Sequence, residues 1–143
     1  MTQNQQEQPT VFIVDDDPAI RFAMQALMDS VNIEHEIYSS GDEFLEKVDD
    51  HRAGCLVLDI RMPGLGGLEL QEELIKRDST LPIIFITGHG DVPMAVDAMQ
   101  KGAVDFIQKP FRDQDLLDRI REALKTDAER REEQQKHAEV AER

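Results

Sequence analysis

Five short apolar runs alternate with amphipathic segments along the chain, and this alternation limits the possible fold more than any other feature. Each run is a predicted strand, and Cys55–Leu58, which shows no apolar–polar alternation, is predicted to be buried on both faces. The runs are Val11–Val14, Glu36–Tyr38, Cys55–Leu58, Ile83–Thr87 and Val104–Ile107. Strict alternation of strand and helix implies right-handed βαβ crossovers and a parallel sheet covered on both faces. We therefore predict an α/β fold: a flavodoxin-like, doubly wound, five-stranded parallel sheet of order 2-1-3-4-5 with five helices.

The segments between the runs carry helix signals. Asp17 and Pro18 are typical of a helix N-cap and first helical position. Ser40 and Glu43 have the spacing of a capping box, and Gly102 is suited to end the fourth helix. The first helix has an apolar face formed by Ile20, Ala23, Met24, Leu27, Met28 and Val31. The last has an inward stripe of Leu116, Leu117, Ile120 and Leu124.

The charge balance narrows the class of partner. There are 30 Asp and Glu residues against 16 Lys and Arg, a net charge of −14. This argues against direct nucleic-acid binding, whose affinity comes largely from Lys and Arg contacts to phosphate, and favours cationic partners or a divalent metal. No run approaches the ~18 apolar residues of a membrane span, and the polar start of the chain is unlike a signal peptide. With Cys55 as the single cysteine, predicted to be a small buried hydrophobe, we expect a cytoplasmic protein without membrane contact.

Carboxylates follow two of the predicted strands. Asp15 and Asp16 come directly after the first apolar run, and Asp59 after the third. In the predicted order these strands are neighbours at the switch point, so their carboxyl ends meet. Three clustered carboxylates repel one another unless a cation joins them, and hard oxygen ligands suit Mg²⁺. A metal placed there can bind phosphoryl oxygens while one carboxylate acts as nucleophile and forms an aspartyl phosphate.

Two further side chains are expected at the same edge of the sheet. Thr87 ends the fourth apolar run and supplies a hydroxyl. Lys109, which follows the fifth run and precedes Pro110, supplies a cation for a phosphoryl group. His89, flanked by glycines and without ligand spacing to another histidine, is predicted to be a loop residue.

Taken together, these motifs resemble the two-component response-regulator receiver domain over residues 10–125. The matching elements are Asp15-Asp16, Asp59-Ile60-Arg61-Met62-Pro63-Gly64, Thr87 and Lys109-Pro110-Phe111. The stretches Thr87–Ala95 and Gly102–Phe106 resemble the FixJ-like branch, whose members usually join a receiver to a helix-turn-helix transcription module.

The resemblance implies a role for each acid. Asp59 would accept a phosphoryl group from the phosphohistidine of a sensor histidine kinase. Asp16 and Asp59, with the backbone carbonyl of Arg61, would ligate Mg²⁺ (or Mn²⁺). Asp15 would bind the metal directly or through water. Such a domain is not an enzyme in the usual sense, but a phosphoacceptor that assists its own phosphorylation and dephosphorylation.

It also implies the parts of a switch. Lys109 would pair with the phosphate, and the Lys109-Pro110 peptide would be cis. Thr87 would move to hydrogen-bond the phosphate, and Phe106 would turn inward behind it. Many receivers have tyrosine at this second position. Phenylalanine lacks the hydroxyl, so gating would rest on packing alone.

The organisation that follows has three parts. Residues 1–9 are predicted to be a disordered tail, 10–125 the receiver, and 126–143 a helical, solvated linker toward an output module absent from this chain. Phosphorylation would change the surface formed by the fourth helix (Val92–Lys101), the fifth strand and the fifth helix. A homodimer would form through that surface, and DNA would be bound only by the absent helix-turn-helix module.

Three alternatives stay open at this point. A stand-alone receiver would act by binding another protein or by relaying phosphate. A haloacid-dehalogenase-like Mg²⁺ phosphatase needs a second acid two residues after its nucleophile, where this chain has Arg61. A flavodoxin would bind FMN phosphate, which the acids would repel, and no Ser/Thr/Gly-rich phosphate loop follows the first strand.

Overall fold

A computed structural model of the protein describes residues 8–49, 51–88 and 90–142. Five parallel strands form one sheet of order β2-β1-β3-β4-β5, which confirms the predicted flavodoxin-like fold. The strands are β1 (Thr10–Val14), β2 (His35–Tyr38), β3 (Gly54–Asp59), β4 (Ile83–Thr87) and β5 (Asp105–Gln108). The first seven residues of the predicted tail, and His89, lie outside the described residues.

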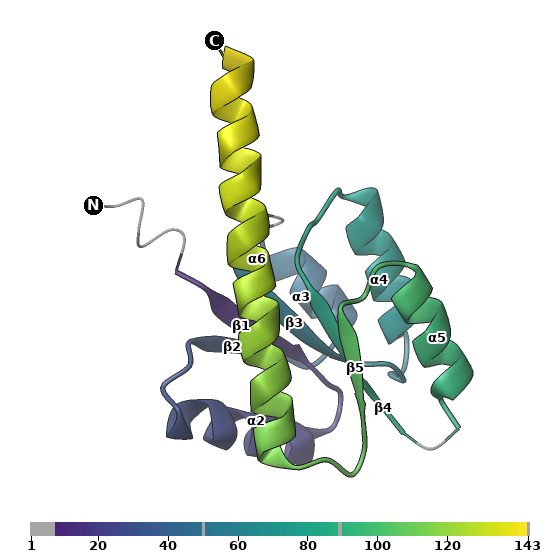
Figure 1. Cartoon of the computed structure of the whole chain (residues 1–143). Coiled ribbons are helices and arrows are strands. Elements are labelled where there is room, and N and C mark those ends of the chain that lie inside the picture. Colours follow the sequence, from purple (N-terminus) through teal and green to yellow (C-terminus); the bar gives the residue numbers. More distant parts are fainter. Residues whose placement is uncertain (1–7, 50, 89, 143) are drawn as a thin grey trace.

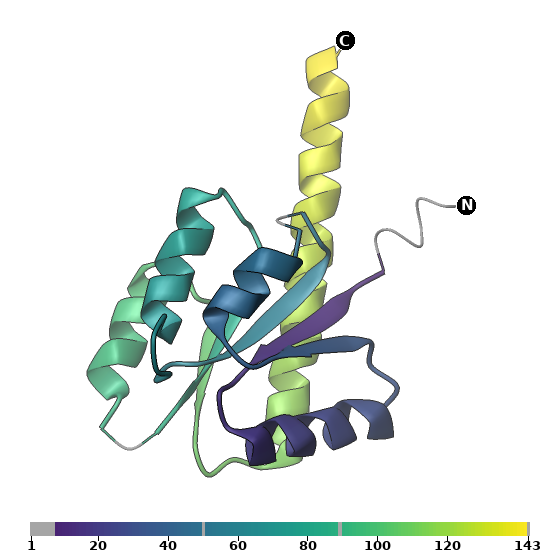
Figure 2. The same cartoon turned by 180° about the vertical axis from the view of Figure 1, so that it is seen from behind.

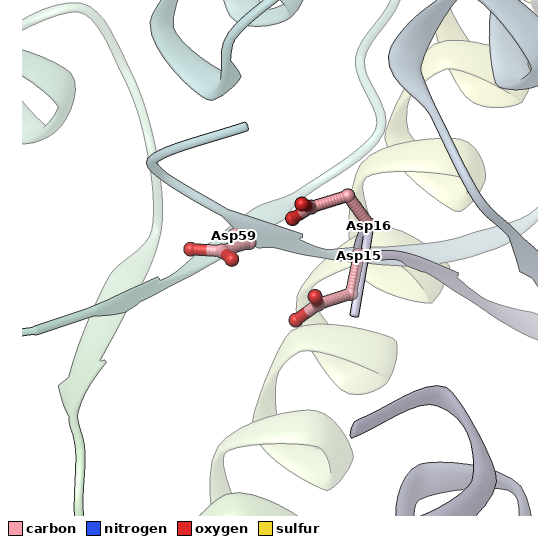
Figure 3. A group of neighbouring side chains, drawn as sticks. All are labelled: Asp15, Asp16 and Asp59. Atoms are coloured by element: carbon pink, nitrogen blue, oxygen red, sulfur yellow. The ribbon is translucent and has the colours of Figure 1, made fainter. Parts of the chain in front are cut away.

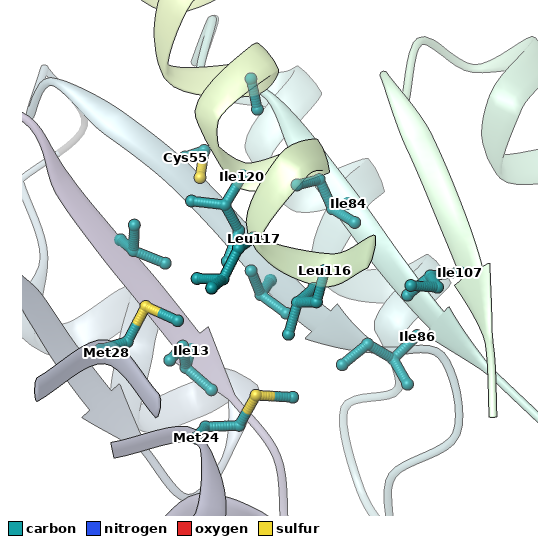
Figure 4. Close-up of a cluster of buried hydrophobic side chains, with 13 residues drawn as sticks. Ile13, Met24, Met28, Cys55, Ile84, Ile86, Ile107, Leu116, Leu117 and Ile120 are labelled. Atoms are coloured by element: carbon teal, nitrogen blue, oxygen red, sulfur yellow. The ribbon is translucent and has the colours of Figure 1, made fainter. Parts of the chain in front are cut away.

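Helices cover both faces of the sheet (Figures 1 and 2). They are α2 (Pro18–Ser30), α3 (Gly41–Lys47), α4 (Gly67–Lys76), α5 (Val92–Gln100) and α6 (Asp113–Glu142). Helices α2 and α6 bury Met24, Met28 and Ile120 on one face, together with Cys55 of β3 (Figure 4). Helices α3, α4 and α5 cover the other face, where the aromatic rings of Phe12 and Phe44 meet edge to face. The two cores hold the carboxyl ends of β1 and β3 at one edge of the sheet.

Local signals placed most helix starts correctly. The Asp17 side chain accepts from the Ala19 N–H at 2.9 Å and caps α2. Ser40 accepts from the Glu43 N–H at 3.1 Å and caps α3. Ala23 is exposed, however, because the buried stripe of α2 is narrower than the predicted one and centres on Met24 and Met28.

Several strand bounds differ from the prediction by one residue, and one of these differences is at Asp59. Asp59 is the last residue of β3, paired in register with Ile86, where the apolar pattern ended the strand at Leu58. Strand β5 begins at Asp105, one residue after the predicted Val104. The apolar pattern does not show backbone pairing. The pairing of β3 with β4 extends to Asp59, and it fixes the backbone of that residue.

The entrance to β3 requires glycine. Gly54 has φ +143°, and a Cβ there would lie 1.8 Å from the Thr10 carbonyl oxygen. Any side chain at this position would force β1 and β3 apart.

Helix α6 runs for 30 residues and extends past the body of the domain (Figure 1). Its sheet-facing stripe continues beyond Ile120 and Ala123 to Asp127, which is only 2 % exposed. Asp127 Oδ2 accepts from the Gly54 N–H and from Arg131 Nε, each at 2.9 Å, and Arg131 Nη2 donates to the Arg52 carbonyl. The first turns of the predicted solvated extension are therefore anchored to the start of β3. Within the described residues no helix is long and apolar enough to cross a membrane.

Candidate functional site

Three carboxylates gather where β1 and β3 end. Asp15 and Asp16 directly follow β1, and Asp59 closes β3, the neighbouring strand (Figure 3). One carboxylate oxygen from each residue lies within 4.8 Å of the others. Strands far apart in sequence thus bring the three acids together, because both strands are parallel and adjacent.

Asp15 is the most buried of the three, at 1 % exposure. Its Oδ1 accepts from the Asp17 N–H at 2.9 Å, but its buried Oδ2 has no hydrogen-bond partner among the described residues. Burial raises the pKa of Asp15 above its ordinary value, against the hydrogen bond from Asp17 and the charge of Lys109. A buried carboxylate oxygen without a donor is costly, and a cation at the cluster would satisfy it.

Asp59 is half-buried and accepts from the Arg61 N–H at 3.3 Å. Burial, followed by the negative charge of Asp15, raises the pKa of Asp59 to about 6, while Lys109 opposes the shift. The exposed Asp16 leaves the cluster open to solvent. Three oxygen donors with an open side fit Mg²⁺ or Mn²⁺, which keep several waters when bound by carboxylates.

Thr87 and Lys109 lie at the ends of β4 and β5. Thr87 is 2 % exposed, and its Oγ1 donates to the Ile107 carbonyl at 3.4 Å. The Lys109 N–H donates to the Thr87 carbonyl at 2.8 Å, and the Lys109-Pro110 peptide is cis. The Lys109 charge acts on both Asp15 and Asp59. The hydroxyl of Thr87 is thus engaged on the β5 side and is not bonded to the acids.

Phe106 lies within β5, paired in register with Phe85 of β4. Its side chain is half-buried and packs against the core beneath α3, α4 and α5.

Helix α4 begins in close contact with the backbone at the end of β3. A Cβ on Gly67 would lie 2.6 Å from the Asp59 carbonyl oxygen and 2.8 Å from the Ile60 Cα. The Gly67 N–H donates to the Ile60 carbonyl at 3.2 Å. Glycine therefore allows the helix to brace the backbone of Asp59.

Sequence reasoning missed the role of Asp91. This residue is 3 % exposed, and its two carboxylate oxygens serve different loops. Oδ1 accepts from Arg61 Nε, and Oδ2 accepts from the Gly88 N–H at 2.9 Å. The Arg61 guanidinium, then the Gly88 N–H, hold the pKa of Asp91 below its ordinary value. In the sequence, the place of Asp91 directly before Val92-Pro93 is a signal for the start of a helix, and such a signal does not reveal a partner 30 residues away.

Comparisons with known proteins agree with this geometry. The family model described as the response regulator receiver domain matches residues 11–121. The response regulator protein TmoT of Ectopseudomonas mendocina is 47% identical over 119 residues, which cover 83% of this chain and 54% of that protein. The transcriptional regulatory protein FixJ of Bradyrhizobium diazoefficiens is 42% identical over 115 residues, covering 80% of this chain and 56% of that protein.

Among solved structures, the response regulator StyR superposes with a TM-score of 0.89 at 45% identity, covering 94% of this chain and 68% of that one. The chain spans about half the length of the curated relatives it matches.

Proposed function

Because this chain belongs to the response regulator receiver domain family of two-component signalling, we propose that it is a switch controlled by phosphorylation of Asp59. The observation that carries the proposal is the meeting of Asp59 with Asp15 and Asp16, whose oxygens lie within 4.8 Å. Strand pairing and the close approach of Gly67 hold the Asp59 backbone still, so its carboxylate is presented in one place.

The proposed reaction is transfer of a phosphoryl group from the phosphohistidine of a sensor histidine kinase. An Asp59 oxygen attacks phosphorus, the P–N bond breaks as the P–O bond forms, and histidine leaves with the electron pair and takes a proton. Asp15, Asp16, Asp59 and the Arg61 carbonyl would hold Mg²⁺ or Mn²⁺, which when bound neutralises charge on the phosphoryl oxygens. The Lys109 ammonium, whose charge already acts on Asp59, would pair with the same group.

Thr87, at the same site, would respond to phosphorylation of Asp59. To reach a phosphate on Asp59, the Thr87 hydroxyl exchanges its bond with the Ile107 carbonyl for a phosphate oxygen. The bond it leaves is long, at 3.4 Å, and the phosphate offers a charged acceptor, so the exchange favours the phosphorylated arrangement. Phe106, which is half-buried in this structure, would then turn further inward and change the surface of β5.

We propose that this altered surface, formed by α5, β5 and α6, makes a homodimer. Helix α5 exposes three apolar side chains there: Val92, Val96 and Met99. The relatives are about twice as long as the region that matches this chain. We therefore propose that the dimer controls an output module that follows α6. A cytoplasmic location would give the protein access to both a partner kinase and DNA. The anchored extension of α6 favours this function over a stand-alone receiver.

The test is incubation of the protein with Mg²⁺ and a small phosphodonor, followed by intact-mass measurement. Wild type should gain one phosphoryl group, and Asp59→Asn should gain none. Asp105→Asn, which removes a carboxylate from β5 away from the acid cluster, is the matched control and should be labelled as wild type is. Equal labelling of wild type and Asp59→Asn would refute Asp59 as the phosphoacceptor.

A further inference from the structure

We infer that Asp91 is a positioning residue for metal binding at Asp59, and that it acts through Arg61. The inference rests on the proposed function, because it assumes that the acid cluster binds Mg²⁺. Asp91 does not itself belong to the cluster of Asp15, Asp16 and Asp59; Arg61, in the loop that follows β3, is bonded to both Asp59 and Asp91.

Arg61 is held at two points. Its backbone N–H donates to Asp59 Oδ1 at 3.3 Å, and its Nε is bound by Asp91 Oδ1. The Arg61 side chain is 66% exposed, so packing does little to fix it. The ion pair with Asp91 is therefore the main constraint on the Arg61 side chain. The Arg61 carbonyl, the proposed metal ligand, is attached to the same Cα as the bonded N–H and the bonded side chain, so both attachments restrict its position.

Asp91 is itself held firmly enough to serve as an anchor. Its side chain is only 4% exposed, and the Gly88 N–H binds the oxygen that Arg61 does not use. The Ala95 N–H donates to its carbonyl at 2.9 Å, which ties it to the first turn of α5. Both carboxylate oxygens are needed, one for each donor. Asparagine has one acceptor oxygen, so Asp91→Asn must present its NH₂ group to either Arg61 or Gly88.

The ion pair also controls where a positive charge lies. With Asp91 in place, the guanidinium is neutralised away from the acid cluster. Released, it is a cation on a flexible stem two residues from Asp59, beside three clustered carboxylates. It would then compete with Mg²⁺ for the same oxygens. Loss of the anchor and gain of a competitor both weaken metal binding.

The test is to titrate the metal-free full chain with Mg²⁺. Binding is measured by calorimetry and by the NMR signals of the backbone amides of residues 59–61. Asp91→Asn should weaken Mg²⁺ affinity about tenfold. In an Arg61→Ala background the same change should have less than a twofold effect, because Asp91 then has no arginine to hold. Asp97→Asn on α5, which breaks the 3.3 Å ion pair to Lys101, is the matched control and should leave the affinity unchanged.

The Mg²⁺ affinities distinguish a failure of the Asp91 inference from a failure of the proposed function. If wild type binds Mg²⁺ and the affinity of Asp91→Asn is within twofold of the wild-type affinity, the role of Asp91 is refuted while the proposed function stands. Effects of Asp91→Asn and Arg61→Ala that multiply independently would refute action through Arg61. A wild-type chain that shows no Mg²⁺ binding would overturn both proposals.

Discussion

Replacing Asp127 with alanine should loosen helix α6 from the sheet. The change removes the acceptor for the Gly54 N–H and for Arg131 Nε, both now at 2.9 Å from Oδ2. Hydrogen bonds to a charged group contribute about 1.5–3 kcal/mol each, and the buried Gly54 N–H would be left unpaired. Within the part of the chain that the structure describes, the buried Asp127 Oδ1 has no hydrogen-bond partner, so its removal offsets part of that loss. We expect a net cost of about 3 kcal/mol, which is roughly a 100-fold rise in the opening equilibrium.

Cys55 provides the assay, because it is the only cysteine in the sequence and is fully buried beneath α6 beside Ile120 (Figure 4). Burial, and then the charge of Asp127, raises the pKa of the Cys55 thiol to about 12. A thiol reagent therefore labels it only after α6 opens. The labelling rate should rise roughly 100-fold in Asp127→Ala, in proportion to the opening equilibrium.

Glu129→Gln is the matched control, since it removes an exposed carboxylate from the same turn of α6. Its labelling rate should stay within about twofold of wild type, as expected for a surface substitution. If Asp127→Ala is labelled no faster than Glu129→Gln, the buried carboxylate does not fasten α6 and the reasoning is wrong.

Three further outcomes follow from the site and its supports. Without metal, the free energy of unfolding should fall by up to about 3 kcal/mol as pH rises from about 4 to 7, because the raised pKa of Asp59 makes the folded state hold its proton more tightly than the unfolded state does. Urea titrations should show a shallower slope for Asp59→Asn, and an unchanged slope would exclude Asp59 as its source. Mg²⁺ at 100 times its dissociation constant should stabilise wild type by about 2.7 kcal/mol and Asp59→Asn much less, measured by thermal unfolding. Gly54→Ala should be more destabilising than Gly64→Ala: both glycines have positive φ, but only the first Cβ meets another atom, 1.8 Å from the Thr10 oxygen. Equal losses in denaturant would show that the collision is relieved.

The fold could be predicted because its signals are local and repeated. The central strands β1, β3 and β4 are largely apolar runs, and the order of the sheet follows from strict alternation of strands with helices. The meeting of Asp15, Asp16 and Asp59 follows from that order, since each acid marks the end of a strand. Caps such as Asp17 depend on residues two or three positions away, and those too were predicted correctly.

The contacts that sequence reasoning missed are polar and distant. Arg61 and Asp91 are 30 positions apart, and Gly54 and Asp127 are 73 apart. The sequence does not distinguish a buried carboxylate from a solvated one. The helix-forming composition after Leu124 therefore indicated a solvated extension and did not reveal that Asp127 is buried. Only the three-dimensional arrangement shows which charged side chains are buried.

Helix α6 is also a lever arm. Arg131 bonds the helix to the Arg52 carbonyl in the body of the domain, and 11 residues of continuous helix follow to Glu142, about 16 Å at 1.5 Å per residue. A tilt of about 5° around Arg131 would displace Glu142 by about 1.4 Å. Adjustments too small to disturb the packing around Ile120 are thereby amplified at the far end, to the scale on which a hydrogen bond forms or breaks.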